Sequence, residues 1–404
     1  MHSSGYLVRA GDGPVVPPDA VPEQTSFVDP TVTIEGEVVV GRGVYVAPFA
    51  QLIASRESPI SIGPNSNVQD HVLITAAYQS SPARTARLAA AGLDPSEGIV
   101  VGGRCILAHG CTVKGPARIG VMNGDSDLLT GDQAVILGFG SQVDGAILEG
   151  GSGVSILGRV GPGVRLRRGF FVLPGKNVLT QDEADDPELG KARLGIEADQ
   201  AFNDGVLRVN QLLALTYTEL CGHDPNTVSG ISVNPGHASF NPDRNIPTFA
   251  GEPITQPGFR NRIIGAAHFA DSLSHLGEVM GNQVSIRADE GGPFEFGTVV
   301  AMRSGVVAHA LENSEILAGN GVSYGQGMLV HGGDRRTAEG DRVSTVIEDD
   351  VTLGSYSVVF RSLVGRGSRI GHKSAVIDTT LPAGSVVPAR TVYLNEARYG
   401  RVEW

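Results

Sequence analysis

The sequence predicts an all-β protein with two left-handed parallel β-helix domains of the hexapeptide-repeat type and a C-terminal helix after the first. Three observations support this fold class. Branched aliphatic residues recur every six positions over long stretches of the chain. Glycine supplies 55 of the 404 residues, about twice its ~7% share in an average protein. Aromatic residues make up only 5%, which suits narrow coils that enclose aliphatic side chains.

The period of six matches neither the 3.6-residue period of a helix nor the simple alternation of a strand. It fits a short strand followed by a turn, with one aliphatic residue pointing inward from each face of a three-sided coil. Stacked coils then bury a continuous ladder. A β-sandwich is the alternative, but its strands rarely keep one fixed period. The ladder runs through Ile34, Val40, Val46, Leu52, Ile62, Val68, Ile74, Val101, Leu107, Val113 and Ile119, and later through Ile347, Leu353, Val359, Val364, Ile370 and Val376.

The six-residue rhythm is interrupted in places, and these breaks mark the other elements. Residues 77–98 predict a loop with a short helical turn. Residues 181–220 have an Asp-rich start followed by apolar residues at helical spacing, which predicts a helix packed along the first stack. A Pro-, Asn- and Gly-rich stretch then predicts an extended linker. We therefore divide the chain into an N-terminal extension (1–25), a first β-helix with its helix (26–220), a linker (221–262) and a second β-helix (263–404).

Composition excludes several classes of partner. The net charge of −12 and the lack of a basic stripe argue against nucleic acid. No apolar run reaches the ~18 residues of a membrane-spanning helix, so we expect no membrane association. The first residues do not resemble a signal peptide. Three cysteines fit a reducing compartment, and we expect a cytoplasmic protein; they are Cys105, Cys111 and Cys221.

Motifs in both stacks resemble the gamma-class carbonic anhydrases. Residues 59–70 read P-I-S-I-G-P-N-S-N-V-Q-D, and residues 101–120 contain L-A-H and K-G-P, near the family's L-A-H and H-G-P. In the second stack, residues 286–312 follow the family's I-R-x-D-E-G-x-P…H-A-x-E. The resemblance covers most of the chain, counted as two copies of one module. It implies a tandem duplication of this family's β-helix.

The resemblance also implies a metal site. Members of the family bind one divalent metal, usually zinc or iron, through three histidines. Two of these come from one subunit and the third comes from its neighbour in a trimer. At these three positions the first copy has Thr75, His109 and Lys114, and the second copy has His309, Gln326 and His331.

Neither copy therefore keeps three ligands, but the two copies keep complementary ones. The second copy retains the pair His309 and His331, and the first retains His109. We expect one composite site where the two kinds of module meet, within one chain or between chains. Three histidines with an open fourth position are what catalytic zinc requires, so we expect zinc, with iron or cobalt as alternatives. A pair of modules that has lost its metal and kept a scaffold role is the competing interpretation.

Further site residues follow from the same resemblance. In the family, the counterparts of Arg287 and Asp289 form an ion-pair network between subunits. The counterpart of Glu290 lies near the metal as a proton-transfer group, and that of Glu312 is a second proton shuttle. The first copy has lost the Arg and the acidic pair.

Three more positions complete the predicted site. Gln69 matches a glutamine that hydrogen-bonds near the metal water, and Asn210 matches an asparagine near the CO2 site. The second copy has Arg303 where the first has Gln69. An arginine beside the metal would add a fixed cation that clamps an anion or blocks turnover.

The resemblance thus implies an enzyme whose metal-bound hydroxide attacks CO2, giving reversible hydration to bicarbonate, or attacks a related small carbonyl or carboxyl substrate. The expected partners are CO2 and bicarbonate or a small carboxylate. We also expect a homo-oligomer with trimer-like packing of modules. Two alternatives stay open: a catalytically silent scaffold or assembly protein of the same fold, and a hexapeptide acyltransferase that uses a catalytic histidine in the same coils.

Overall fold

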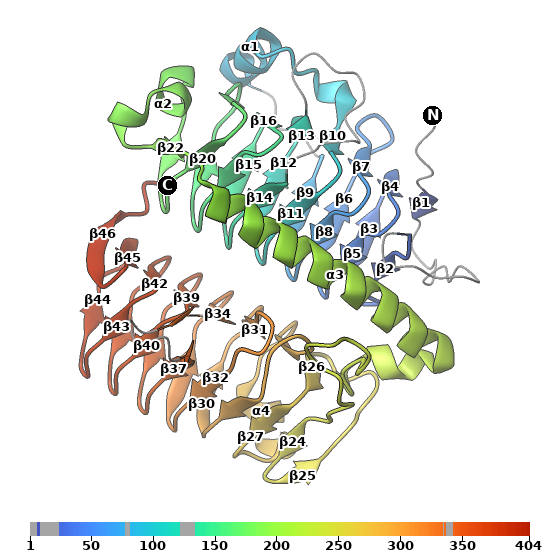
Figure 1. Ribbon diagram of the computed structural model, residues 1–404, viewed down its shortest axis with the longest axis vertical. Coiled ribbons are helices and arrows are strands. Elements are labelled where there is room, and N and C mark those ends of the chain that lie inside the picture. Colours follow the sequence, from blue (N-terminus) through green and yellow to red (C-terminus); the bar gives the residue numbers. More distant parts are fainter. Residues whose placement is uncertain (1–5, 9–23, 77–80, 122–133, 334, 337–341) are drawn as a thin grey trace. The chain divides into compact units, whose positions relative to one another are not determined.

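A computed structural model of the chain describes residues 6–8, 24–76, 81–121, 134–333, 335–336 and 342–404. The chain forms two compact units. Unit 1 comprises Met1–Glu219 together with Glu403–Trp404, and unit 2 comprises Leu220–Val402. Each unit is a left-handed β-helix with three parallel sheets (Figure 1), which confirms the predicted fold class. Among the described residues, no helix combines the length and apolar character needed to cross a membrane.

Unit 1 stacks short strands into three sheets, which we name 1a, 1b and 1c. Sheet 1a contains β1 (Tyr6–Val8, antiparallel to its neighbour), β4 (Val38–Val40), β7 (Ile60–Ile62), β10 (Ile99–Val101), β13 (Ala117–Val121), β16 (Ile147–Glu149) and β19 (Arg165–Leu166). Sheet 1b contains β2 (Phe27–Val28), β5 (Tyr45–Val46), β8 (Asn67–Val68), β11 (Cys105–Leu107), β14 (Val135–Leu137), β17 (Gly153–Val154), β20 (Phe170–Val172) and the antiparallel β22 (Ala192–Leu194). Sheet 1c contains β3 (Thr33–Glu35), β6 (Gln51–Ile53), β9 (Leu73–Thr75), β12 (Thr112–Lys114), β15 (Gln142–Asp144), β18 (Arg159–Val160) and β21 (Asn177–Val178).

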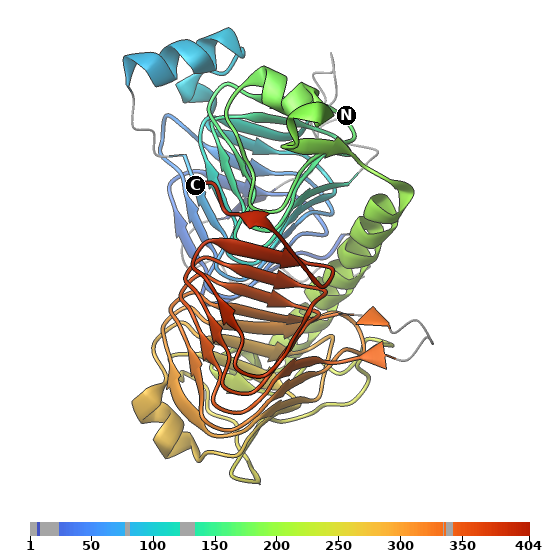
Figure 2. The ribbon, with the colours of Figure 1, turned by 90° about the vertical axis from the view of Figure 1, so that its left-hand side faces the viewer.

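Unit 2 repeats the arrangement in sheets 2a, 2b and 2c, and Figure 2 shows its red and orange coils as stacked three-sided loops. Sheet 2a contains the antiparallel β25 (Glu252–Pro253), β24 (Thr248–Phe249), β27 (Ala267–Phe269), β29 (Phe294–Phe296), β32 (Ile316–Ala318), β37 (Thr345–Ile347), β40 (Leu363–Val364) and β43 (Thr380–Leu381). Sheet 2b contains β30 (Val299–Met302), β33 (Val322–Tyr324), β38 (Thr352–Leu353), β41 (Arg369–Ile370) and β44 (Val386–Val387). Sheet 2c contains β23 (Ile231–Ser232), β26 (Arg262–Gly265), β28 (Ser285–Ala288), β31 (Val307–Ala310), β34 (Leu329–Gly332), β39 (Val358–Phe360), β42 (Ala375–Ile377), β45 (Thr391–Leu394) and the antiparallel β46 (Ala397–Arg401). A separate hairpin joins β35 (Arg335–Arg336) and β36 (Arg342–Val343).

The six-residue ladder forms the core of both units. Apart from Ile34, which is partly buried, every residue of the predicted ladder lies fully inside one of the two cores. Burying a Val, Leu or Ile side chain contributes about 1.5–3 kcal/mol, so the ladder is the main source of stability. Glycines allow the coils to stack closely, because a Cβ on Gly63 would lie 2.5 Å from the backbone of Gly102 in the next coil. Cys105, Cys111 and Cys221 are buried and form no disulfide.

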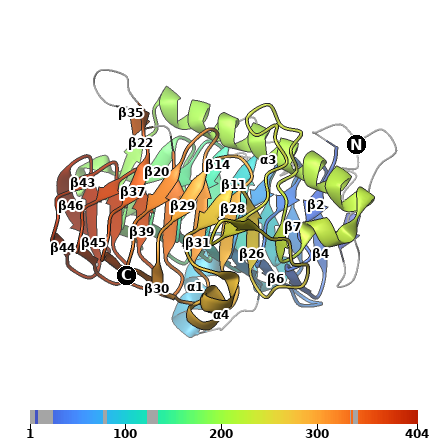
Figure 3. The same cartoon turned by 90° about the horizontal axis from the view of Figure 1, so that it is seen from below.

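Helices lie outside the coils. The loop predicted at 77–98 contains α1 (Pro82–Ala90), which begins at Ser81, whose side chain accepts a hydrogen bond from the Arg84 amide; residues 77–80 lie outside the described part. In unit 2, α4 (Leu273–Val279) packs beside β30 (Figure 3).

The helix predicted within residues 181–220 is α3 (Glu197–His223), and two further elements precede it. These are α2 (Gln181–Asp185) and then the edge strand β22. A capping box between Thr180 and Glu183 starts α2. Tyr217 of α3 stacks on Phe27 and Tyr45, so this helix packs on the outer face of sheet 1b.

The segment 221–262 is not a linker, so the second β-helix begins before the predicted boundary at residues 262/263. Its strands β23 and β24 pair in parallel with β26 and β27, so it forms the first coil of unit 2. These strands have two residues each, and the loops between them carry the Pro, Asn and Gly that dominate the composition. Within the predicted extension 1–25, β1 pairs with β4, while residues 1–5 and 9–23 lie outside the described part.

Candidate metal centre

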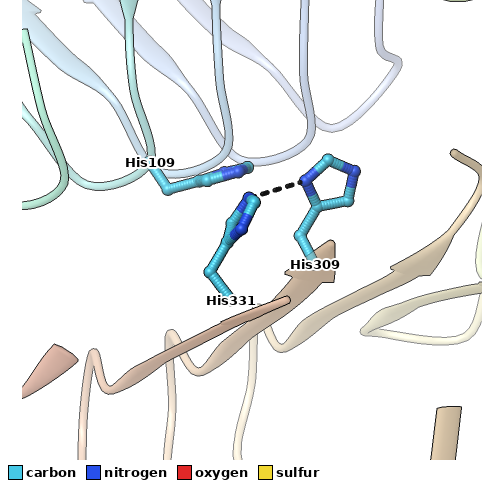
Figure 4. Close-up of side chains that lie close together, drawn as sticks. All are labelled: His109, His309 and His331. Atoms are coloured by element: carbon cyan, nitrogen blue, oxygen red, sulfur yellow. Dashed lines mark hydrogen bonds between the residues drawn. The ribbon is translucent and has the colours of Figure 1, made fainter. Parts of the chain in front are cut away.

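His309 and His331 lie directly opposite each other on neighbouring strands of sheet 2c. They occupy β31 and β34 in register, and both are buried. The Nδ1 atom of His309 is 3.3 Å from the Nε2 atom of His331, the contact dashed in Figure 4. Two ligand nitrogens at ~2.0–2.1 Å from a tetrahedral zinc are themselves about 3.3 Å apart. The pair therefore has the spacing of two ligands of one metal ion.

The other ring nitrogen of each histidine contacts an oxygen. His309 Nε2 lies 3.1 Å from Asp289 Oδ1 and 3.1 Å from Glu290 Oε1. His331 Nδ1 lies 2.6 Å from the carbonyl oxygen of Gly332. Ligating histidines typically donate their second N–H to such oxygens, which turns the lone pair of the first nitrogen toward the metal. The two nitrogens that face each other thus require a proton or a cation between them.

A proton on His309 is favoured near neutral pH. Burial and the nearby Arg287 lower the pKa of His309, but Glu290 and Asp289 raise it by more, to about 8. Without a metal, this proton supplies the hydrogen bond between the two histidines. Metal binding has to displace it.

Arg287 and Asp289 form a buried ion pair within unit 2, next to His309. The Arg287 guanidinium contacts one carboxylate oxygen of Asp289, and the other oxygen contacts His309. Arg287 also lies opposite His309 in the register of sheet 2c. Removing one member of a buried ion pair costs about 3–5 kcal/mol of stability. This pair therefore stabilises the end of β28 next to His309.

The two predicted proton-transfer residues differ in exposure. Glu290 is buried and touches His309. Glu312 is exposed in the turn that follows β31. A proton path from the site to solvent would need a buried carboxylate next to His309 and an exposed carboxylate nearby, and these two residues have those positions.

His109 lies in unit 1, in the turn between β11 and β12, and is fully buried. Its Nδ1 atom is 3.0 Å from Asp70 Oδ2, and neither side chain is exposed. Its backbone amide donates to Gln69 Oε1 at 3.2 Å, so the predicted Gln69 lies beside this histidine. The Asp70 contact again engages one ring nitrogen, so Nε2 is the atom that could ligate a metal.

Two candidate site residues of unit 1 were missed by sequence reasoning, although both belong to the quoted motif N-V-Q-D. One is Asp70, described above. The other is Asn67, which is fully buried and whose side-chain amide has no hydrogen-bond partner among the described residues. A buried amide without a partner costs free energy, so Asn67 is suited to bind a small polar molecule.

Asn210 lies on α3, and its amide donates to the Val206 carbonyl at 2.9 Å. The helix rises 1.5 Å per residue and strands are ~4.8 Å apart, so about three helical residues pass each strand. Counting from Tyr217, which stacks on β2 and β5, this places Asn210 between the levels of β8 and β11.

Arg303, the cation expected beside the metal, is not buried with this group. It is exposed in the turn between β30 and β31, and Gln326 is exposed in the next such turn. These turns correspond to those of Gln69 and His109 in the first copy, which are buried. In the first copy, Thr75 and Lys114 lie opposite each other in register, as His309 and His331 do, but Lys114 is exposed.

Comparison with known proteins gives related sequences. No family model matches the chain. A carbonic anhydrase from Methanosarcina thermophila is 31% identical over 222 residues, which are 52% of this chain and 81% of that protein. The carboxysome assembly protein CcmM from a Nostoc species is 28% identical over 152 residues, which are 35% of this chain and 24% of that protein. CcmM from Synechococcus elongatus is 30% identical over 161 residues, covering 37% of this chain and 28% of that protein.

The solved structures similar to this chain include a proposed acetyltransferase from Desulfovibrio desulfuricans G20, at 14% identity and a TM-score of 0.23, covering 96% of this chain and 68% of that chain.

The motifs of both copies and the match over most of the Methanosarcina enzyme point to the same family. The chain therefore belongs to the gamma-class carbonic anhydrase family.

Proposed function

We propose that His109, His309 and His331 together bind one divalent metal, zinc in the first place, and that the chain catalyses the reversible hydration of CO2. One observation carries this proposal. Each of the three histidines has one ring nitrogen next to an oxygen of its own unit, at Asp70, Asp289 and Gly332. This pattern fixes the tautomers that metal ligation needs.

The donor set suits zinc, since three imidazoles are the ligands of a catalytic zinc with an open position. When bound, such a metal lowers the pKa of a water ligand to about 7. Glu290, buried against His309, is positioned to accept a proton, and the exposed Glu312 is positioned to pass it to solvent. The amides of Asn67 and Gln69 would orient the oxygen atoms of CO2 or bicarbonate.

The split of ligands between the copies supports a composite centre. The second copy supplies the paired strand ligands and the acidic residues, and the first supplies the turn ligand and the amides. We further propose that the chain acts in the cytoplasm as a homo-oligomer in which the modules pack as in a trimer. Bicarbonate or another small carboxylate is the anionic partner.

A scaffold role is the second candidate. It is favoured by the match to two proteins named for carboxysome assembly and by the loss of ligands at Thr75, Lys114 and Gln326. A scaffold would not require the buried acids and histidines of unit 2 to keep ligand geometry.

The test is CO2 hydration by the purified chain after reconstitution with zinc, followed by stopped-flow with a pH indicator. We expect hydration well above the buffer rate, and its loss in Glu290→Gln with the metal retained. A zinc-loaded chain with no rate above buffer would refute the enzyme and favour the scaffold.

A further inference from the structure

The loop of residues 233–246, between β23 and β24, lies beside the strand that leads to the acidic pair. The side-chain amide of Asn241 donates to the carbonyl oxygen of Ala288 at 3.0 Å, across 47 residues of sequence. Ala288 is the last residue of β28. Asp289 and Glu290 follow it directly.

The Ala288 carbonyl sits where the chain changes direction. The backbone pairs with β31 up to Arg287 on one side and with β26 up to Ala288 on the other. Beyond Ala288 it leaves the sheet, and both following carboxylates reach His309 Nε2 at 3.1 Å. The orientation of the Ala288 peptide therefore determines whether two acids can approach one ring nitrogen.

The loop is braced, so the Asn241 amide is not a loose surface contact. The Asn241 backbone amide donates to the Ala238 carbonyl at 3.1 Å. Asn234 is fully buried. Its side-chain oxygen accepts a hydrogen bond from the backbone amide of Asn245 at 2.6 Å, and its backbone amide donates to the Asn245 carbonyl at 3.2 Å. This reciprocal pair closes the base of the loop.

The first copy has the same backbone geometry at this place but other residues after it. Its equivalent carbonyl, that of Ala54, packs against Gly36 just as the Ala288 carbonyl packs against Gly265; a Cβ on either glycine would lie 2.4 Å from the oxygen. There, however, Ser55 and Arg56 follow in place of the acidic pair. No carboxylate has to be aimed at a histidine in that copy.

We propose that Asn241 is a positioning residue of the metal centre. By holding the Ala288 carbonyl, it aims Asp289 and Glu290 at His309. It thereby sets the direction of the His309 lone pair and the place of the proton acceptor. This inference rests on the proposed metal-dependent function, and it assigns a role to a segment that lies outside the motifs of the family resemblance.

The test compares Asn241→Ala with Ser239→Ala, a matched truncation of an exposed residue of the same loop, in the full chain. Cobalt(II) is the probe, because its visible absorption reports coordination geometry. Loss of a residue that hydrogen-bonds to a metal ligand typically weakens metal affinity ~10–100-fold. Asn241 acts on such residues and does not touch a ligand itself. We therefore expect about tenfold weaker binding and shifted bands in Asn241→Ala, with unchanged behaviour in Ser239→Ala and equal melting temperatures of the metal-free proteins.

A second measurement separates this inference from the proposed function. In the metal-free chain, the ring nitrogen resonances of His309, assigned by their loss in His309→Ala, should shift in Asn241→Ala and stay in place in Ser239→Ala. A wild-type chain that binds no cobalt would refute the proposed function, whereas the His309 resonances would still decide the role of Asn241. Unchanged resonances, or equal cobalt affinity and spectra in the wild type and Asn241→Ala, would overturn the inference.

Discussion

Each of the three candidate histidines has one ring nitrogen next to an oxygen of its own unit, at Asp70, Asp289 and Gly332. Sequence motifs located His109, His309 and His331, and the acids Asp289 and Glu290. They did not reveal Asp70, because its role depends on a contact across a turn. Arg303 is exposed, and the cation expected beside the metal stays a prediction.

Asp70→Asn should weaken zinc binding by about 10–100-fold, because it removes the carboxylate that orients His109. Competition with a chromogenic chelator measures the affinity. Asp29→Asn is the matched control, since Asp29 is a buried turn aspartate of the same unit that contacts Thr31. Equal zinc affinity in Asp70→Asn and the control would contradict the assigned role.

Zinc affinity should rise with pH up to about 8 and then level off, because zinc displaces the proton of His309, whose pKa is raised to about 8. The same shift affects the metal-free chain. A pKa raised above its unfolded value of about 6.5 contributes about 2 kcal/mol below pH 6.5, and this is lost as pH rises through 8.

Chelator titrations between pH 6 and 9 measure the first effect. Thermal unfolding of the metal-free chain and of His309→Gln over the same range measures the second, and the stability difference between them should shrink above pH 8. A zinc affinity that is constant from pH 6.5 to 8 would contradict the proton competition.

At the scale of elements, the six-residue ladder predicted the coils because each inward residue repeats at one place in every turn. The first coil of unit 2 escaped prediction since β23 and β24 have two residues each, too few to show a pattern among Pro, Asn and Gly. The edge strand β22 was hidden in the same way between α2 and α3. The Asn241 contact joins residues 47 apart in sequence, and no local pattern encodes it.

Leu107→Ala should lower the free energy of unfolding of unit 1 by about 2–5 kcal/mol, because Leu107 is fully buried in the ladder and truncation leaves a cavity. Urea unfolding measures the loss. Ser61→Ala, on the outer face of β7, is the control and should cost less than about 0.5 kcal/mol. A loss below 1 kcal/mol for Leu107→Ala would contradict the ladder as the source of stability.

At the scale of the whole molecule, the proposed function implies that duplication let each copy keep a different part of one ancestral centre. Unit 2 retains the register pair, the ion pair and the acids. Unit 1 retains the turn histidine, its aspartate and the amides of the substrate side. Each unit keeps its own share in ligand geometry, as a composite centre requires and as independent decay of two copies would not maintain.

The most direct test of this account is the zinc content of the purified chain and of its single-histidine variants, measured by mass spectrometry after reconstitution and dialysis. We predict one zinc per wild-type chain and none in His109→Ala, His309→Ala or His331→Ala, with His372→Ala, outside the motif, retaining one. Full zinc content in His109→Ala would show that unit 2 binds metal without the first copy and would contradict the composite centre.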